Sequence, residues 1–269
     1  MEGMNKAVFR DRDGVINEII YHHDIGVIDS PFTPGQFHLR DGVAQAIREI
    51  NGSGFLAIVA TNQPGLAKGH FDEHVLNLIT EKMVDDLALG GAHLDDVYTC
   101  LHHPKGTGNG KGDPRYIMDC TCRKPKSGLL LEASRKHRIN LDASYMIGDS
   151  ITDIQAGASA GCITFLIGQL KCDLCRIMEK SGVKPDFIVP SLLEAVRVIN
   201  RRENVKISYA DLPEGISLRN LTLDREQCVN DHRSDGKEYG TGDSLERNGH
   251  IGKDAALPVR TTLCQEENK

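Results

Sequence analysis

Two carboxylates, Asp11 and Asp13, stand two positions apart directly after the first apolar run of the chain. Two more, Asp149 and Asp153, follow a later apolar run that ends at Ile147. Such side chains could supply an anionic nucleophile, a proton donor and oxygen ligands for a divalent cation, which is the chemistry that phosphoryl transfer needs. Turns rich in Asp and Gly also follow strands for structural reasons, so neither pair settles the chemistry alone.

Groups that suit a phosphate follow in two other segments. Thr61, Asn62 and Gln63 come after the second apolar run and offer a hydroxyl, amides and backbone N–H groups. Arg123 and Lys124 precede a helical stretch and supply two positive charges. Each segment alone matches an ordinary loop or a solvated basic pair. Their succession along the chain, each near the end of a predicted strand or the start of a helix, is what indicates one shared site.

A cluster of sulfur and imidazole ligands lies between these two segments. Cys100 is followed by His102 and His103, and Cys120 and Cys122 come after the loop of residues 103–119. Cysteines in a reducing compartment are better interpreted as metal ligands or buried thiols than as disulfides. Three thiolates and one imidazole can complete a tetrahedral zinc site, and either histidine fits it.

The elements that must position these residues form an alternating pattern. Short apolar runs alternate with amphipathic stretches from Lys6 to about Asn200, which predicts a parallel sheet with crossover helices. Most runs are continuously apolar, as expected where helices cover both faces. We therefore predict an α/β fold with a doubly wound, Rossmann-like parallel sheet whose strand ends meet in one crevice. The predicted strands are residues 7–9, 55–60, 96–100, 144–147, 163–167 and 187–189, and the predicted helices are residues 42–51, 72–89, 128–136, 150–160 and 192–200.

The chain of 269 residues divides into two parts of different composition. Residues 1–203 carry the apolar pattern and are predicted to form one domain, whereas residues 204–269 are predicted to be a largely disordered polar tail. The formal net charge of −6 argues against nucleic acid or an anionic membrane as a partner. No apolar run approaches the ~20 residues that span a bilayer. We expect a cytoplasmic protein and take a monomer as the simplest state.

In their order, these motifs resemble those of the haloacid-dehalogenase-like phosphatase superfamily. The runs Asp-Arg-Asp-Gly-Val-Ile-Asn, Thr-Asn-Gln-Pro-Gly and Cys-Arg-Lys-Pro narrow the resemblance to D-glycero-D-manno-heptose 1,7-bisphosphate phosphatases and related histidinol phosphatases. The resemblance covers about residues 7–193. It implies a magnesium-dependent phosphatase that forms an aspartyl-phosphate intermediate and has a zinc-binding loop. The short spacing from Asp13 to Thr61 predicts that no large cap domain is inserted there.

The resemblance also implies a role for each matching residue. Asp11 would be the nucleophile and a Mg²⁺ ligand, and Asp13 would act as general acid and base and lend its backbone carbonyl to the metal. Asp149 would complete the Mg²⁺ site. Thr61 and Lys124 would stabilise the transferring phosphoryl group.

The remaining implied roles concern the substrate and the second metal. Arg123 would contact the substrate, and Asn62 and Gln63 are predicted as further substrate contacts. The family position favours His102 over His103 as the zinc ligand. The implied Zn²⁺ ligands are Cys100, His102, Cys120 and Cys122.

Several departures from the family pattern keep other functions open. Arg10 stands where such strands carry an apolar residue, and residues 18–36 and 103–119 form longer loops than usual. A heptose 1,7-bisphosphate is the first predicted substrate, and a small amino-alcohol phosphate, histidinol phosphate, is its rival. A nucleic-acid 3'-phosphatase is disfavoured by the acidic charge balance. A catalytically weak binding or scaffold protein is the alternative outside enzymes, and the intact carboxylates argue against it.

Overall fold

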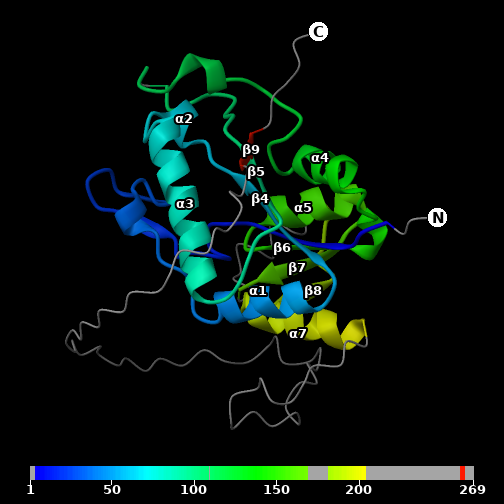
Figure 1. The fold of residues 1–269 in the computed structure, drawn as a ribbon. Coiled ribbons are helices and arrows are strands. Elements are labelled where there is room, and N and C mark those ends of the chain that lie inside the picture. Colours follow the sequence, from blue (N-terminus) through cyan, green and yellow to red (C-terminus); the bar gives the residue numbers. More distant parts are fainter. Residues whose placement is uncertain (1–3, 109, 169–180, 204–260, 264–269) are drawn as a thin grey trace, which may run out of the picture. The chain divides into compact units, whose positions relative to one another are not determined.

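The computed structural model describes residues 4–108, 110–168, 181–203 and 261–263 (Figure 1). Its core is a parallel sheet of seven strands in the order β8-β7-β6-β1-β4-β5-β9. All six predicted strands are present, so the predicted fold class is confirmed. The strands are β1 (Ala7–Arg10), β4 (Leu56–Asn62), β5 (Asp96–Cys100), β6 (Tyr145–Gly148), β7 (Ile163–Ile167), β8 (Phe187–Val189) and β9 (Thr261–Leu263).

The order of the strands makes a crevice beside β1. From β1 the chain adds β4 and β5 on one side, and then returns to add β6, β7 and β8 on the other. Arg10 at the end of β1 pairs with Val59 on one side and Ile147 on the other. Ligands of such sheets bind at the carboxyl ends of the strands where the order reverses. The residues that follow β1, β4 and β6 therefore meet at one place.

Helices cover both faces of the sheet. Val8 packs in an apolar cluster with α1 and α7, whereas its neighbours Ala7 and Phe9 pack with α4. Figure 1 shows α1 and α7 side by side beneath the sheet. The helices are α1 (Val43–Gly52), α3 (Glu73–Leu89) and α7 (Leu192–Arg202) on one face, and α4 (Gly128–His137) and α5 (Ile151–Ala160) on the other.

Some short elements were not predicted. The long segment after Asp13 contains a hairpin of β2 (Ile20–His22) and β3 (Val27–Asp29). The hairpin is tied to the short helix α2 (Gly65–Lys68) by an ion pair of 2.8 Å between Lys68 and Asp29. Within the described chain, the hairpin, one short 3-10 turn and α1 are the only elements between Asp13 and the start of β4, consistent with the absence of a cap domain.

The strand β9 comes from the predicted polar tail. It pairs in parallel with the outer edge of β5. Residues 204–260 and 264–269 lie outside the described residues, so the prediction of disorder is not tested for them. None of the helices in the described ranges combines the length and apolar character required to cross a bilayer.

Candidate active site

Asp11 follows β1 and stands at the start of a tight turn. Its backbone N–H donates to the carbonyl of Ile147 at 3.0 Å, which fixes it beside the end of β6. The turn closes through the carbonyl of Arg12, which accepts from the N–H groups of Ile16 and Asn17 at 2.7 and 3.1 Å. Oδ1 of Asp11 accepts from the Arg12 N–H at 2.7 Å. The carboxylate is therefore held by its own loop at the carboxyl end of β1.

Lys124 links the loop before α4 to the nucleophile position. Its ammonium lies 3.0 Å from Asp11 Oδ1 and 2.5 Å from Asp153 Oδ1, and it donates to the carbonyl of Ala60 at 2.8 Å. The lysine is 2% exposed, so these contacts replace its hydration. Two carboxylates raise the pKa of Lys124 despite its burial. The lysine is held in its charged form, as a phosphate-binding group requires.

Three carboxylates gather around this one lysine. Oxygens of Asp11, Asp149 and Asp153 lie within 4.8 Å of one another, a donor set that could hold a metal ion. Burial, followed by the negative charges of the other two carboxylates, raises the pKa of Asp149 to about 7. Burial likewise raises the pKa of Asp11, and Lys124 opposes this effect. The excess of negative charge and the hard oxygen ligands fit a divalent cation.

Glycines allow two of these carboxylates to approach the backbone. A Cβ atom on Gly14, whose φ is +78°, would lie 2.0 Å from Asp149 Oδ2, and one on Gly148 would lie 2.1 Å from the Asp153 side chain. Asp153 is fully buried, and its Oδ2 accepts from the N–H and hydroxyl of Ser150 at 3.1 and 2.7 Å. Asp153 therefore positions Lys124, which leaves Asp11 and Asp149 as the more available metal ligands.

The segment after β4 lies beside this cluster, and its amides bind protein groups. Asn62 accepts from the N–H of Lys124 at 3.0 Å and donates to its carbonyl at 3.1 Å. These two bonds tie β4 to the loop before α4 that carries Lys124. Gln63 is fully buried and donates to Thr61 at 3.0 Å and to Asp13 at 2.5 Å. Both ends of the Gln63 amide are therefore bound to protein groups, and its contact with the substrate stays a prediction.

Asp13 is surrounded by donors that the sequence analysis did not identify as functional. Arg12 and Asn17 both donate to its carboxylate, in addition to Gln63. The signal for Arg12 and Asn17 was present, because both lie in the same seven-residue motif as the two aspartates. Their pairing with Asp13 depends on how the turn folds.

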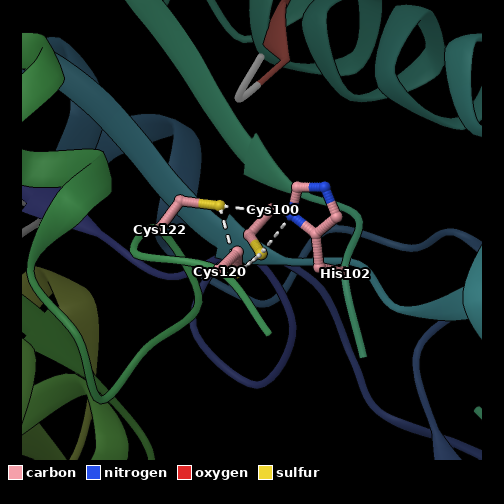
Figure 2. Close-up of side chains that lie close together, drawn as sticks. All are labelled: Cys100, His102, Cys120 and Cys122. Atoms are coloured by element: carbon pink, nitrogen blue, oxygen red, sulfur yellow. Dashed lines mark hydrogen bonds between the residues drawn. The ribbon is translucent and has the colours of Figure 1, made fainter. Parts of the chain in front are cut away.

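Cys100, His102, Cys120 and Cys122 form a second, buried cluster, which Figure 2 shows. The Sγ atoms of Cys100 and Cys122 lie 3.6 and 3.4 Å from that of Cys120, and His102 Nδ1 lies 3.7 and 3.4 Å from Cys100 and Cys122. Metal–sulfur bonds of about 2.3 Å around a tetrahedral ion would give sulfur separations of about 3.8 Å. A disulfide would require about 2.05 Å. The four ligand atoms therefore fit one tetrahedral metal ion.

Arg123, the neighbour of Lys124 in the chain, is bound to the loops of this cluster. Its guanidinium donates to the carbonyl of His102 at 3.1 Å, and its N–H donates to Cys120 Sγ at 3.3 Å. His103 lies outside the cluster and accepts from the N–H of Lys105 at 3.3 Å. Of the two histidines that the sequence offered, only His102 is placed to bind the metal.

Comparisons with known proteins show the family of this chain. A HAD-hydrolase-like family model matches residues 121–195. The D-glycero-beta-D-manno-heptose-1,7-bisphosphate 7-phosphatase of Photorhabdus laumondii is 42% identical over 210 residues, 78% of this chain and 94% of that protein. The protein of the same name from Haemophilus influenzae is 35% identical over 199 residues, 74% of this chain and 98% of that protein.

A solved structure shows the same fold. The D,D-heptose 1,7-bisphosphate phosphatase from B. bronchiseptica, complexed with magnesium and phosphate, is 29% identical and has a TM-score of 0.59. The match covers 73% of this chain and 99% of the B. bronchiseptica chain. The fold is that of a haloacid-dehalogenase-like phosphatase. Within that class, the chain belongs to the family of the D-glycero-β-D-manno-heptose-1,7-bisphosphate 7-phosphatases, and the predicted resemblance is confirmed.

Proposed function

We propose that this phosphatase hydrolyses D-glycero-D-manno-heptose 1,7-bisphosphate to the heptose monophosphate. The observation that carries the proposal is the convergence of Asp11, Lys124 and Asp149 at the end of β1. The names of the relatives, at 35–42% identity over most of their length, support the choice of substrate.

Two metal ions belong to this proposal. Mg²⁺ would be held by the carboxylates of Asp11 and Asp149 and by the backbone carbonyl of Asp13, and it would offset the charge of the phosphate oxygens. The magnesium and phosphate in the B. bronchiseptica enzyme support this assignment. Zn²⁺ would be held by the three cysteines and His102, in a closed site that leaves no position for a reacting group. Its role would be to fix the loop that carries Arg123 and Lys124.

In the first step, Asp11 attacks the phosphorus. Its Oδ1 is bound by the Arg12 N–H and by Lys124, so Oδ2 is the attacking oxygen. As the bond from phosphorus to the sugar oxygen breaks, Asp13 gives its proton to that oxygen. Lys124 and Thr61 stabilise the charge on the transferring group. The product is the heptose monophosphate and a phosphorylated Asp11.

In the second step, water attacks the phosphorus of the aspartyl phosphate. Asp13 now takes the proton from this water, and the bond between phosphorus and Asp11 breaks. Inorganic phosphate leaves, and both aspartates return to their starting forms. Arg123 directly precedes Lys124 in the chain. We infer that it binds the part of the sugar that does not react.

The test is turnover of two substrates by the purified protein with Mg²⁺. We expect kcat/KM for the heptose bisphosphate to exceed that for histidinol phosphate by ~10-fold or more. Asp11→Asn should reduce phosphate release by about 10³-fold or more, whereas Asp85→Asn on the exposed side of α3 should not. A preference for histidinol phosphate would reject the substrate, and full activity of Asp11→Asn would reject the nucleophile.

We also infer the partner, the location and the oligomeric state of the protein. The names of the relatives support a small phosphorylated sugar as the partner, and the net charge of −6 argues against nucleic acid or an anionic membrane. We place the enzyme in the cytoplasm as a monomer. Light scattering coupled to size-exclusion chromatography would test the monomer, and a mass twice that of the chain would reject it.

A further inference from the structure

The carboxylate of Asp13 is held by three side chains at once. Arg12 donates to Oδ1 from Nε and Nη2 at 3.2 and 3.1 Å, and its Nη2 lies 3.3 Å from Oδ2. Asn17 Nδ2 donates to Oδ1 at 3.0 Å, and Gln63 Nε2 donates to Oδ2 at 2.5 Å. Both oxygens are therefore bound, and the plane of the carboxylate is fixed.

These three donors are buried, so their arrangement cannot easily relax. Arg12 is 1% exposed, and Asn17 and Gln63 have no exposed surface. A buried guanidinium without partners is costly, and Arg12 has Asp13 and Gln63 Oε1, the latter at 2.7 Å. Asn17 Nδ2 also donates to the carbonyl of Glu18 at 2.8 Å.

Gln63 can take only one amide orientation here. Its Oε1 accepts from Arg12, while its Nε2 donates to Asp13 and to Thr61 Oγ1. Turning the amide over would place its NH₂ group against the guanidinium and its oxygen against the carboxylate. Gln63 therefore sets the distance between Asp13 and the hydroxyl assigned to the phosphate.

We propose that Arg12 and Gln63 are positioning residues that orient the Asp13 carboxyl group for proton transfer. The inference rests on the proposed function, in which Asp13 protonates the leaving oxygen and later takes a proton from water. A proton crosses efficiently only when donor and acceptor come within about 2.6–3.2 Å, so a carboxyl group that rotates freely loses part of its effect. Neither residue touches the phosphorus or the leaving group; both act through Asp13.

The test uses two leaving groups of different basicity. A sugar phosphate releases an alkoxide, which needs a proton from Asp13, whereas 4-nitrophenyl phosphate releases a weakly basic phenolate that can leave without one. For Gln63→Met, kcat/KM should fall by about 10²-fold on the sugar phosphate and by less than ~10-fold on 4-nitrophenyl phosphate. A residue that only stabilises the fold would lower both values equally.

A second Gln63 variant and two control variants complete the experiment. Gln63→Glu keeps an acceptor for Arg12 but cannot donate to Asp13. It should show the same unequal loss of kcat/KM on the two substrates, and it replaces Gln63→Met if that variant folds poorly. Gln45→Met, on α1, makes the same side-chain change away from the site and should alter neither value. Asp13→Asn should show the largest split of all.

The outcomes separate the two proposals. Equal losses on both substrates, or no loss, for the Gln63 variants would overturn the positioning role while leaving the phosphatase mechanism intact. If Asp13→Asn itself lost activity equally on both substrates, the acid role of Asp13 would be wrong, and the inference would fall with it.

Discussion

Arg10 offers a sharp test of how burial determines the stability of this sheet. Arg10 ends β1 with no exposed surface, and its three guanidinium nitrogens find no hydrogen-bond partner among the described residues. Alternate residues of a strand share a face, so Arg10 lies on the face of Val8, in the layer of α1, and Asp11 lies on the opposite face. We predict that Arg10→Met stabilises the fold and leaves turnover unchanged.

The size of the gain follows from the cost of the buried charge. Burial lowers the pKa of Arg10 well below its usual value, to about 9, although the negative charge of Asp95 opposes this effect. That lowering corresponds to about 5 kcal/mol of lost stability at neutral pH. Replacing buried ionic groups by apolar ones typically gains about 1–4 kcal/mol, because neighbours relax around a buried charge. We expect a gain of about 2–4 kcal/mol, which raises the melting temperature by about 4–16 °C.

Thermal and urea unfolding of both proteins at pH 7 and pH 10 measure this gain. Because burial lowers the pKa of Arg10 to about 9, we expect the folded protein to release this proton at a lower pH than the unfolded chain does. Native stability should therefore rise as pH passes 9, and the advantage of Arg10→Met should shrink. Arg12→Met is the matched control: Arg12 is as buried but paired with Asp13, so its loss should cost about 3–5 kcal/mol. An Arg10→Met protein less stable than the native one would refute the reasoning.

Three further predictions concern the rest of the domain. Cys120→Ser should remove bound zinc, measured by metal analysis, and lower the melting temperature, because structural zinc contributes directly to folding; an unchanged metal content would contradict the four-ligand site. Burial acts to raise the pKa of Asp96, but hydrogen bonds from two basic side chains of α4 outweigh it and lower the pKa. Asp96→Asn should therefore cost about 1–2 kcal/mol at pH 7, and this difference should vanish as the pH falls through the lowered pKa. A chain ending at Glu203 should keep its turnover but expose the edge of β5 that β9 covers, and concentration-dependent association in light scattering would reveal it.

Much of the fold was predictable because its signals are local. Apolar runs and turn residues are properties of neighbouring positions, and the carboxyl ends of parallel strands must share one edge of the sheet. Two strands end later than predicted: β1 includes Arg10 and β4 includes Asn62. Pairing with a neighbouring strand extends each of them into polar residues. The hairpin was not predicted, because Tyr21 and Ile28 are 52% and 73% exposed and give no clear alternation.

The sequence by itself determined which chemical groups the site contains, because Asp11, Lys124 and Asp149 each follow or precede an element with a clear local pattern. Tertiary structure alone decided which groups meet. Gln63 stands 50 positions after Asp13 yet binds its carboxylate, and His102 rather than His103 joins the cysteines. Such pairings depend on the register of strands and the path of loops, which bring together residues that no local pattern connects. The same reason explains Arg10, whose burial with no hydrogen-bond partner in the described part of the chain is a property of the packed layer around β1 and not of the motif that follows it.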